Sequence, residues 1–309
     1  MYFGSGRARL AAMLLSAIVF TAACGSDPAP PPPTPSTSAL PPPLFTNWPA
    51  EANEFRFHWA AAPGIDLETG PAVALRAYVE SYRLAGFAGG DHSVVYPGFM
   101  RATPESTGPQ QDPDSLVQLW DVRPETRAGY EADGLKYVQR QVYGYQPTYI
   151  LNLAPQGDGY RATVCLGLYS VYRTDDNDRS RYFSTVADPE TGQPQRYGDS
   201  DGVIEIWRVE LTDKDPRVGN VPVASAVPQR GPLPAPVDDV FGRWFITGNS
   251  LGLWGPLGDS ERIDTPEVRK QCQDVMPDDA AARMAMATGF HTEPPPHGEP
   301  IPGWPAENR

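Results

Sequence analysis

Residues Tyr149–Arg173, with the sequence YILNLAPQGDGYRATVCLGLYSVYR, decide the fold of this chain. They contain two runs rich in β-branched and aromatic residues, and the segment Gln156–Gly159 (QGDG) between them is typical of a tight turn. Apolar side chains alternate along the second run, as in a strand with one buried face: Ala162, Val164, Leu166, Leu168 and Tyr172. The sequence therefore predicts a β-hairpin with arms at Tyr149–Leu153 and Tyr160–Tyr172.

Further strands are predicted downstream of the hairpin. Val203–Leu211 is one, although Glu205 and two other charged residues interrupt its apolar pattern. Arg243–Thr247 is the next, continued by Leu251–Trp254 after a turn at Gly248–Ser250. Because no helical pattern separates these segments, hairpins and loops connect them, and we expect a mainly antiparallel sheet.

The helical pattern lies upstream of the hairpin. Thr69 is predicted to cap a helix that has Pro71 in its first turn and continues to Gly86. A second, shorter helix is expected at Asp114–Trp120. The predicted fold class is α+β: a mainly antiparallel sheet, packed by an N-terminal helix, in a single domain, to which the resemblance described next adds a curved, cone-like shape.

The order of these elements resembles a known family. A leading helix is followed by a long strand with a cysteine (YRATVCLGLYSVYR), a DPETG loop at Asp188–Gly192, a strand with a tryptophan (VIEIWRVEL) and a closing strand (RWFIT). Between Gly70 and Trp254 this pattern resembles the nuclear transport factor two-like cone domains of many secreted actinobacterial lipoproteins. The resemblance implies a cone-shaped α+β domain. The enzymes of that superfamily use polar residues inside the cone, and such residues are not identifiable in this sequence.

The N-terminus carries an export signal. Arg7 and Arg9 precede the uncharged segment Leu10–Ala23, which is too short to span a bilayer comfortably. Thr21–Cys24 (TAAC) resembles the bacterial lipobox, whose cysteine is acylated and becomes the new N-terminus. We therefore expect residues 1–23 to be a lipoprotein signal peptide and Cys24 to hold the protein at the outer face of the bacterial cytoplasmic membrane. The alternatives are cleavage by ordinary signal peptidase, which would release a soluble protein, and an uncleaved anchor helix.

Proline sets the predicted domain organisation. The 36 prolines are concentrated in three regions, which lack apolar periodicity. We expect a disordered tether at 24–44, a globular domain at 45–290 with a Pro-rich loop at 215–237, and a disordered tail at 291–309.

The charge balance excludes one class of partner. The chain has 25 basic and 38 acidic residues, and a formal net charge of -13. Such a chain repels phosphate backbones and anionic lipid surfaces. We expect no nucleic-acid partner, and a membrane contact through the lipid anchor alone.

With Cys24 acylated, Cys165 and Cys272 are left as a pair in an oxidising compartment. The economical prediction is a disulfide between them, and two buried free thiols are the alternative. The cysteine spacing does not fit a zinc site. The acidic run Asp175–Asp178 lacks the alternating ligands and the glycine of a calcium loop, so no metal site is expected there.

One catalytic hypothesis follows from Gly248–Gly252 (GNSLG), which fits the G-x-S-x-G pattern of serine hydrolases. Ser250 would be the nucleophile, followed in the expected order by an acid, Asp264 or else Asp259 or Asp274, and by a histidine, His291 or else His297. The pattern needs a helix after the serine, but the next ten residues contain three glycines and a proline. A secreted serine esterase or hydrolase is therefore the alternative function.

The favoured function is a non-catalytic binding or scaffolding module without a cofactor, for a small apolar ligand or an envelope protein. Seven tyrosines near the hairpin either line a ligand pocket or pack across strands: Tyr137, Tyr143, Tyr145, Tyr149, Tyr160, Tyr169 and Tyr172. Packing across strands is the commoner role of tyrosines at strand spacing.

Overall fold

The computed structural model describes residues 42–132, 134, 140–195, 202–221 and 227–306. The predicted signal peptide, Cys24 and the predicted tether up to residue 41 lie outside these residues, as does the 222–226 segment of the Pro-rich loop. The elements run in the order η1 (Ala50–Ala52), β1 (Glu54–Ala61), α1 (Pro71–Phe87), η2 (His92–Val94), η3 (Val117–Leu119), α2 (Arg127–Ala132), β2 (Val142–Gln156), β3 (Gly159–Gly167), β4 (Val171–Thr174), β5 (Tyr182–Ser184), β6 (Ile204–Thr212), η4 (Pro216–Val218), β7 (Phe245–Ser250), β8 (Leu253–Trp254), η5 (Leu257–Asp259), β9 (Glu261–Arg262), α3 (Pro266–Val275) and α4 (Ala280–Ala287), where η marks a 3-10 helix.

The predicted hairpin is the centre of the sheet. β2 and β3 pair antiparallel from Gln156↔Gly159 to Thr148↔Leu166, and Gly157 takes the positive φ of 55° that its tight turn requires. The predicted second arm is divided, because the chain turns after Gly167 and resumes as β4. The hairpin prediction is otherwise confirmed.

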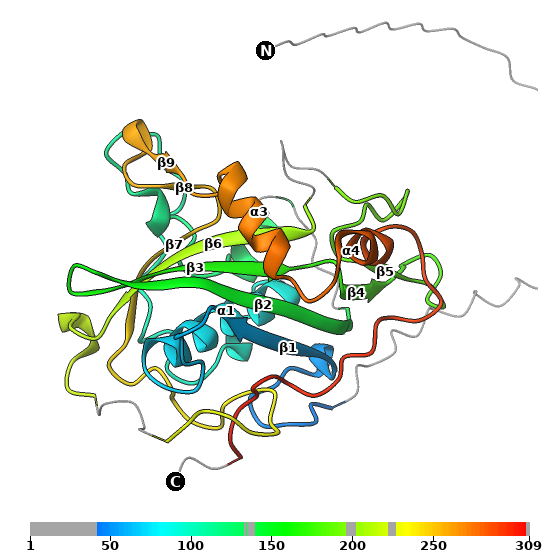
Figure 1. The fold of residues 1–309 in the computed structure, drawn as a ribbon, viewed down its shortest axis with the longest axis horizontal. Helices are drawn as coiled ribbons and strands as arrows, with labels where there is room; N and C mark the ends of the chain where they lie inside the picture. Colours follow the sequence, from blue (N-terminus) through cyan, green and yellow to red (C-terminus); the bar gives the residue numbers. More distant parts are fainter. Residues whose placement is uncertain (1–41, 133, 135–139, 196–201, 222–226, 307–309) are drawn as a thin grey trace, which may run out of the picture. The chain divides into compact units, whose positions relative to one another are not determined.

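The main sheet has seven strands, in the order β5-β4-β2-β3-β6-β7, with β1 added to β2. All of these pairs are antiparallel except β1 with β2. The sheet is curled, and few helices accompany it (Figure 1). The predicted α+β class is thus confirmed. β8 and β9 form a separate two-stranded sheet.

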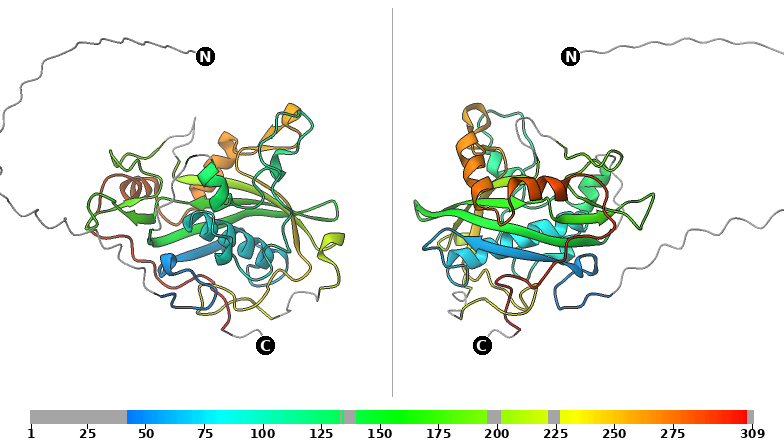
Figure 2. Two further views of the ribbon diagram at one scale, coloured as in Figure 1. Left: turned by 180° about the vertical axis from the view of Figure 1, so that it is seen from behind. Right: turned by 45° about the vertical axis from the view of Figure 1, so that its right-hand side comes forward.

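The two faces of the sheet are covered by different helices, α1 on one side and α3 on the other (Figure 2, right). Trp207 of β6 points toward α1, where its ring lies 5.0 Å from that of Tyr82. Cys165 is the cross-strand partner of Ile206, so both point to the opposite face, where Cys165 is bonded to Cys272 of α3. Because successive side chains of a strand point to opposite faces, the sheet packs one hydrophobic layer against α1 and another against α3.

Two predictions of local helix structure are wrong in detail. Thr69 does not cap α1, because its hydroxyl donates to Asp66 (2.6 Å) and Gly70 is the N-cap residue. Pro71 does begin the helix, as predicted. The expected helix at Asp114–Trp120 is reduced to η3, which is too short to be stabilised by its own hydrogen bonds.

The C-terminal segment, predicted to be a disordered tail, is ordered through residue 306. His291 pairs with Tyr182 of β5, Ile301 with His58 of β1, and Trp304 with Leu233 of the Pro-rich loop. Prolines limit the freedom of the unfolded segment, and its extended backbone matches the edge of a strand. One buried aromatic side chain, Trp304 at 1% exposure, then fixes it to the domain.

Candidate functional site

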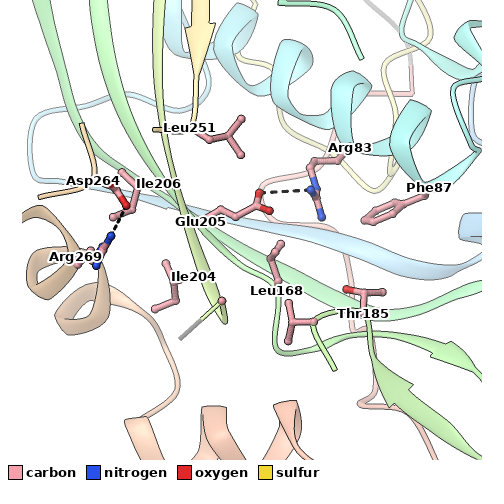
Figure 3. Close-up of a pocket in the computed structure, with 12 residues that line it drawn as sticks. Arg83, Phe87, Leu168, Thr185, Ile204, Glu205, Ile206, Leu251, Asp264 and Arg269 are labelled. Atoms are coloured by element: carbon pink, nitrogen blue, oxygen red, sulfur yellow. Dashed lines mark hydrogen bonds and ion pairs between the residues drawn. The ribbon is translucent and has the colours of Figure 1, made fainter. Parts of the chain in front are cut away.

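A cavity of about 500 Å³ opens beside the N-terminal half of β6 (Figure 3). The C-terminal end of α1 contributes Arg83 and Phe87 to its wall, and α3 contributes Arg269. The remaining wall is largely apolar, and comes from β6 and the segments next to it: Leu168, Thr185, Val186, Gly202, Ile204, Glu205, Ile206, Leu251 and Asp264. The cavity therefore lies between the helices of the two faces, at the edge of the sheet.

The cavity exists because β7 is shorter than β6. β3 pairs with β6 along its whole length, from Ile204 to Thr212, but β7 pairs only from Arg208 onward. β7 ends at Ser250, and the chain turns away into β8. Within the described part of the chain, residues Ile204–Trp207 therefore have a strand on one edge alone.

The direction of the backbone groups on this edge follows from the antiparallel pattern. Leu168 N–H donates to the Val203 carbonyl at 2.9 Å, so the polar groups of Val203 point toward β3. Alternate residues of an antiparallel strand point their N–H and C=O groups to opposite edges. The backbone groups of Ile204 and Ile206 therefore point outward, and the part of the chain that the structure describes supplies no backbone partner for them.

The charged side chains of the wall neutralise one another. Arg83 Nη1 lies 3.5 Å from Glu205 Oε2, and Arg269 Nη2 lies 2.5 Å from Asp264 Oδ2. Burial acts to raise the pKa of Asp264, but hydrogen bonds from Arg262 and Arg269 outweigh it and hold the pKa below its usual value. The wall thus combines apolar surface with two ion pairs of zero net charge.

The disulfide fixes one wall of this cavity. Cys165 and Cys272 have their Cα atoms 5.5 Å apart and their sulfurs bonded, and both side chains are buried. The bond joins α3, which carries Arg269, to the middle of the sheet. Relative motion of α3 and β3 is thereby restricted.

The structure does not assemble the serine triad. Ser250 lies on β7 and His291 beside β5, at opposite ends of the strand order. Gly252 N–H donates to the Ser250 hydroxyl at 3.5 Å, and Asp264 is paired with Arg269. His291 Nε2 is buried without a hydrogen-bond partner.

The local structure around Ser250 also differs from a nucleophile turn. The predicted turn at Gly248–Ser250 is wrong, because these residues belong to β7 and pair with Arg208–Glu210. β8 follows them, in the place where a hydrolase has a helix. A continuous strand pairing with β6 outweighs the turn preference of Gly-Asn-Ser, so Ser250 does not lie on a strand-to-helix turn.

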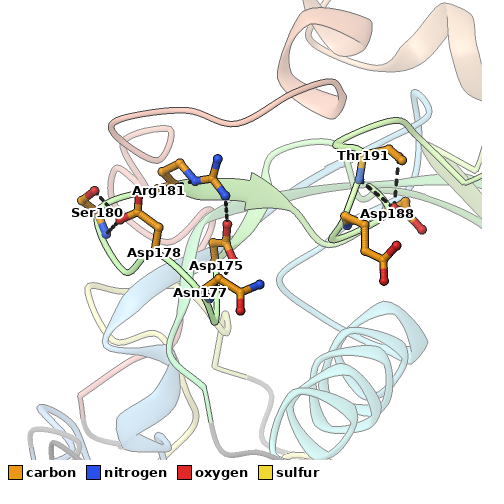
Figure 4. Close-up of polar contacts among 8 residues, drawn as sticks. Asp175, Asn177, Asp178, Ser180, Arg181, Asp188 and Thr191 are labelled. Atoms are coloured by element: carbon orange, nitrogen blue, oxygen red, sulfur yellow. Dashed lines mark hydrogen bonds and ion pairs between the residues drawn. The ribbon is translucent and has the colours of Figure 1, made fainter.

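The acidic turn at Asp175–Asp178 uses its carboxylates internally (Figure 4). Asp175 accepts a hydrogen bond from Asn177 N–H at 2.9 Å and pairs with Arg181. Asp178 accepts from the backbone and the hydroxyl of Ser180. The pKa of Asp175 is lowered by the hydrogen bonds that it accepts itself, above all by the one from Asn177 N–H. Among the described residues, no group of three or more His, Cys, Asp or Glu side chains is placed to hold a metal ion.

The tyrosines near the hairpin serve mainly in packing. Tyr145 and Tyr169 both donate to Asp278 Oδ2, at 3.1 and 2.8 Å, and Tyr172 donates to the Met286 carbonyl. Burial raises the pKa of Tyr145 to about 12. No described tyrosine lines the cavity beside β6, but Tyr149 and Tyr160 line two smaller cavities, of about 220 and 210 Å³, and Tyr137 lies outside the described residues.

Sequence analysis missed the residues of the cavity, although one signal was present. Glu205 is a charged residue that stands between Ile204 and Ile206, in an otherwise apolar stretch of its strand. A charge at such a position needs a partner, and Arg83 supplies it from α1. No local pattern connects these two residues, so the sequence shows the charge without its partner.

Comparisons of the chain with family models, with curated proteins and with solved structures find no match. The resemblance to nuclear transport factor two-like domains therefore stays a prediction. No helix in the described part of the chain has the length and apolar character needed to cross a membrane. Export and acylation of Cys24 also stay predictions, because residues 1–41 are outside the description.

Proposed function

We propose that this chain is an exported, lipid-anchored binding protein, whose domain takes up an uncharged, mainly apolar molecule or segment in the cavity beside β6 and does no chemistry on it. The observation that carries the proposal is the cavity itself. Its volume of about 500 Å³ lies within the range of about 300–1,000 Å³ that is typical of binding sites.

The composition of the wall supports binding of an apolar group. Ile204, Ile206 and Leu168 offer apolar surface, and burial of such surface stabilises a complex by about 25 cal/mol per Å². Because the charged groups of the wall are already paired, a charged ligand would have to displace a partner. An uncharged occupant avoids that cost.

The placement of the predicted catalytic residues supports a non-catalytic role. Asp264 is paired with Arg269, and Ser250 and His291 lie at opposite ends of the strand order. Nucleophilic catalysis needs a base within hydrogen-bond reach of the serine. The serine esterase alternative therefore receives no support from the geometry.

Binding is tested with the chain from Gly25 onward, exported into an oxidising compartment behind a conventional cleavable signal peptide. The probes are two dyes whose fluorescence rises in apolar sites, the uncharged Nile red and the anionic anilinonaphthalene sulfonate (ANS), and native mass spectrometry detects any co-purified molecule. Leu251→Trp fills the cavity wall, whereas Leu253→Trp adds the same side chain at a position with the same 39% exposure outside the cavity. We expect Leu251→Trp alone to reduce the binding of both dyes and the retained mass. Equal signals from both variants, or no binding by the unmodified chain, would overturn the proposal.

Anchoring is tested separately in cells. Cys24→Ala should move the full-length protein from the membrane fraction to the soluble fraction, because the acylated cysteine is the proposed membrane attachment. Retention of that variant in the membrane fraction would contradict a lipid anchor. It would leave the binding proposal untouched, since the two tests have different readouts.

A further inference from the structure

We propose that the occupant of the cavity is an extended, uncharged segment of a partner protein, which adds a strand to β6 along Ile204–Trp207. The inference rests on the proposed function, because it identifies what the same cavity binds. It joins three observations: an unpaired strand edge, other edges of the same sheet capped by extended chain, and a recess of about 500 Å³ between α1 and α3 beside the unpaired edge.

The unpaired edge offers directional hydrogen bonds. Ile204 and Ile206 point an N–H and a C=O each away from β3, into the side where β7 has already ended. Four residues of strand span about 13 Å, the length of a short peptide strand. A small hydrocarbon ligand would leave these backbone groups unpaired, whereas an extended peptide pairs with them.

The domain caps other edges of the sheet with extended chain. Trp59 N–H donates to the Ile301 carbonyl at 2.7 Å, and Ile301 N–H donates to the Phe57 carbonyl at 3.1 Å, on the outer edge of β1. On β5, Tyr182 and His291 exchange two backbone bonds of 2.8 and 2.7 Å. The geometry proposed for β6 is therefore one that this sheet already uses twice.

The recess selects among possible occupants. The edge lies between Arg83 and Phe87 of α1 on one side and Arg269 of α3 on the other. A second copy of the domain would have to bring a sheet edge past both helices, but a single strand needs only the spacing of about 4.8 Å between neighbouring strands. The wall has zero net charge, as its two ion pairs show, so the matching segment is uncharged.

The two sides of the added strand meet different surfaces. Ile204 and Ile206 point to the α3 face, so every second side chain of the partner packs on apolar surface. The intervening side chains point to the α1 face, beside the pair of Glu205 and Arg83. We therefore expect a partner sequence that alternates apolar residues with small or polar uncharged ones.

The test uses random heptapeptides displayed on phage and selected against the same exported chain. The best binder is synthesised in three forms: unmodified, and with N-methyl groups on one or the other alternate set of amides. In an added strand one set of amides faces β6 and the other faces away. Only one of the two methylated forms should lose affinity, by about tenfold, since it loses bonds worth about 1 kcal/mol each.

The protein side is tested at Ile204. Ile204→Pro removes an N–H that points outward and spares the bonds to β3, and proline is tolerated at the start of an edge strand. Ile204→Val keeps the N–H and is the matched control. We expect Ile204→Pro to weaken peptide binding by about tenfold relative to Ile204→Val, which should bind peptide like the unmodified chain. If Ile204→Pro does not fold, the methylated peptides decide the question alone.

The outcomes separate the two proposals. Equal binding of the two methylated peptides, or no enriched peptide at all, would overturn strand addition. If ANS binding remained sensitive to Leu251→Trp in that case, the cavity would still bind an apolar molecule, and the proposed function would stand. If ANS binding were also insensitive to Leu251→Trp, both strand addition and the proposed function would be overturned.

Discussion

The outer edges of β1 and β6 are treated in opposite ways. The edge of β1 is capped by the C-terminal segment, through two backbone bonds between Ile301 and the strand. None of the residues that the structure describes caps the first half of β6, and a cavity lies beside it. An uncovered edge exposes backbone groups that recruit other strands, so proteins ordinarily cover it. The comparison teaches that this chain covers the edge of β1 with its own C-terminal segment, whereas at β6 we propose that a partner strand takes this place.

The cap on β1 holds because Trp304 is anchored in the core. Glu80 of α1 accepts hydrogen bonds from the indoles of Trp304 (2.8 Å) and Trp59 (2.7 Å) and from the hydroxyl of Tyr96 (2.7 Å). Arg76 donates to the Gly303 carbonyl at 2.9 Å, and its guanidinium lies 4.2 Å from the centroid of the Trp304 ring. This cluster, Arg76–Glu80–Trp304, has no counterpart at the edge of β6.

The largest effect is expected from Trp304→Ala, which removes the anchor of the cap. Truncation of a buried tryptophan costs about 3–5 kcal/mol in the free energy of unfolding, measured by urea denaturation. Amide exchange at Trp59 and Ile301 should accelerate, because the N–H groups of these residues lose their bonds to the Ile301 and Phe57 carbonyls. The control is Ile301→Ala, whose side chain is 50% exposed and should matter little. A loss below about 1 kcal/mol for Trp304→Ala would mean that the cap is not anchored there.

The disulfide is the corresponding support at the open edge. Replacing both Cys165 and Cys272 with Ala should reduce the free energy of unfolding by about 2–5 kcal/mol. Because α3 forms a wall of the cavity, ANS affinity should fall as well, whereas amide exchange at Trp59 and Ile301 should stay slow. Unchanged ANS binding would show that the wall does not depend on the crosslink.

Glu80 makes the capped edge sensitive to pH. Burial raises the pKa of Glu80, although Arg76 and three hydrogen bonds act in the opposite direction. The folded protein then holds the proton more tightly than the unfolded chain, so the contribution of this group to stability is complete below the ordinary value of 4.5 and declines as the pH rises toward the folded pKa.

Glu80→Gln tests this sign. The variant should lose about 1–3 kcal/mol, because an amide places a donor among groups that donate. Its free energy of unfolding should also fall less steeply than that of the unmodified chain as the pH rises from 4.5. The measurement is urea denaturation at a series of pH values. Parallel pH profiles would contradict a raised pKa.

The smallest effect on stability is expected at the open edge, from Glu205→Gln. The pair of Glu205 with Arg83 is 3.5 Å long and partly exposed, and such pairs contribute about 0–1 kcal/mol. The variant leaves Arg83 without its partner in the wall, so the cavity gains a positive charge and the anionic ANS should bind more tightly. A fluorescence titration checks this, and weaker binding would contradict the proposed balance of charges.

The sequence by itself determined the local elements of this protein. The alternation along Ala162–Leu166, the glycines around Asp158 and the helical repeat after Pro71 are short-range patterns, and each predicted an element that the structure contains. With Cys24 set aside for acylation, the remaining pair Cys165 and Cys272 predicted the disulfide that joins β3 to α3. Together these features specify the α+β class, because hairpins without intervening helices give an antiparallel sheet.

Only the tertiary structure decided the tail, the cavity and the role of Ser250. Trp304 and Glu80 are 224 residues apart in sequence, and their hydrogen bond forms only when the folded sheet brings both to one place. The cavity depends on where β7 stops beside β6, which no pattern within either strand encodes. Ser250 is part of a strand because pairing with Arg208 outweighs its local turn preference. Local patterns report on neighbours a few residues away, whereas edge pairing and cavities depend on contacts between distant segments.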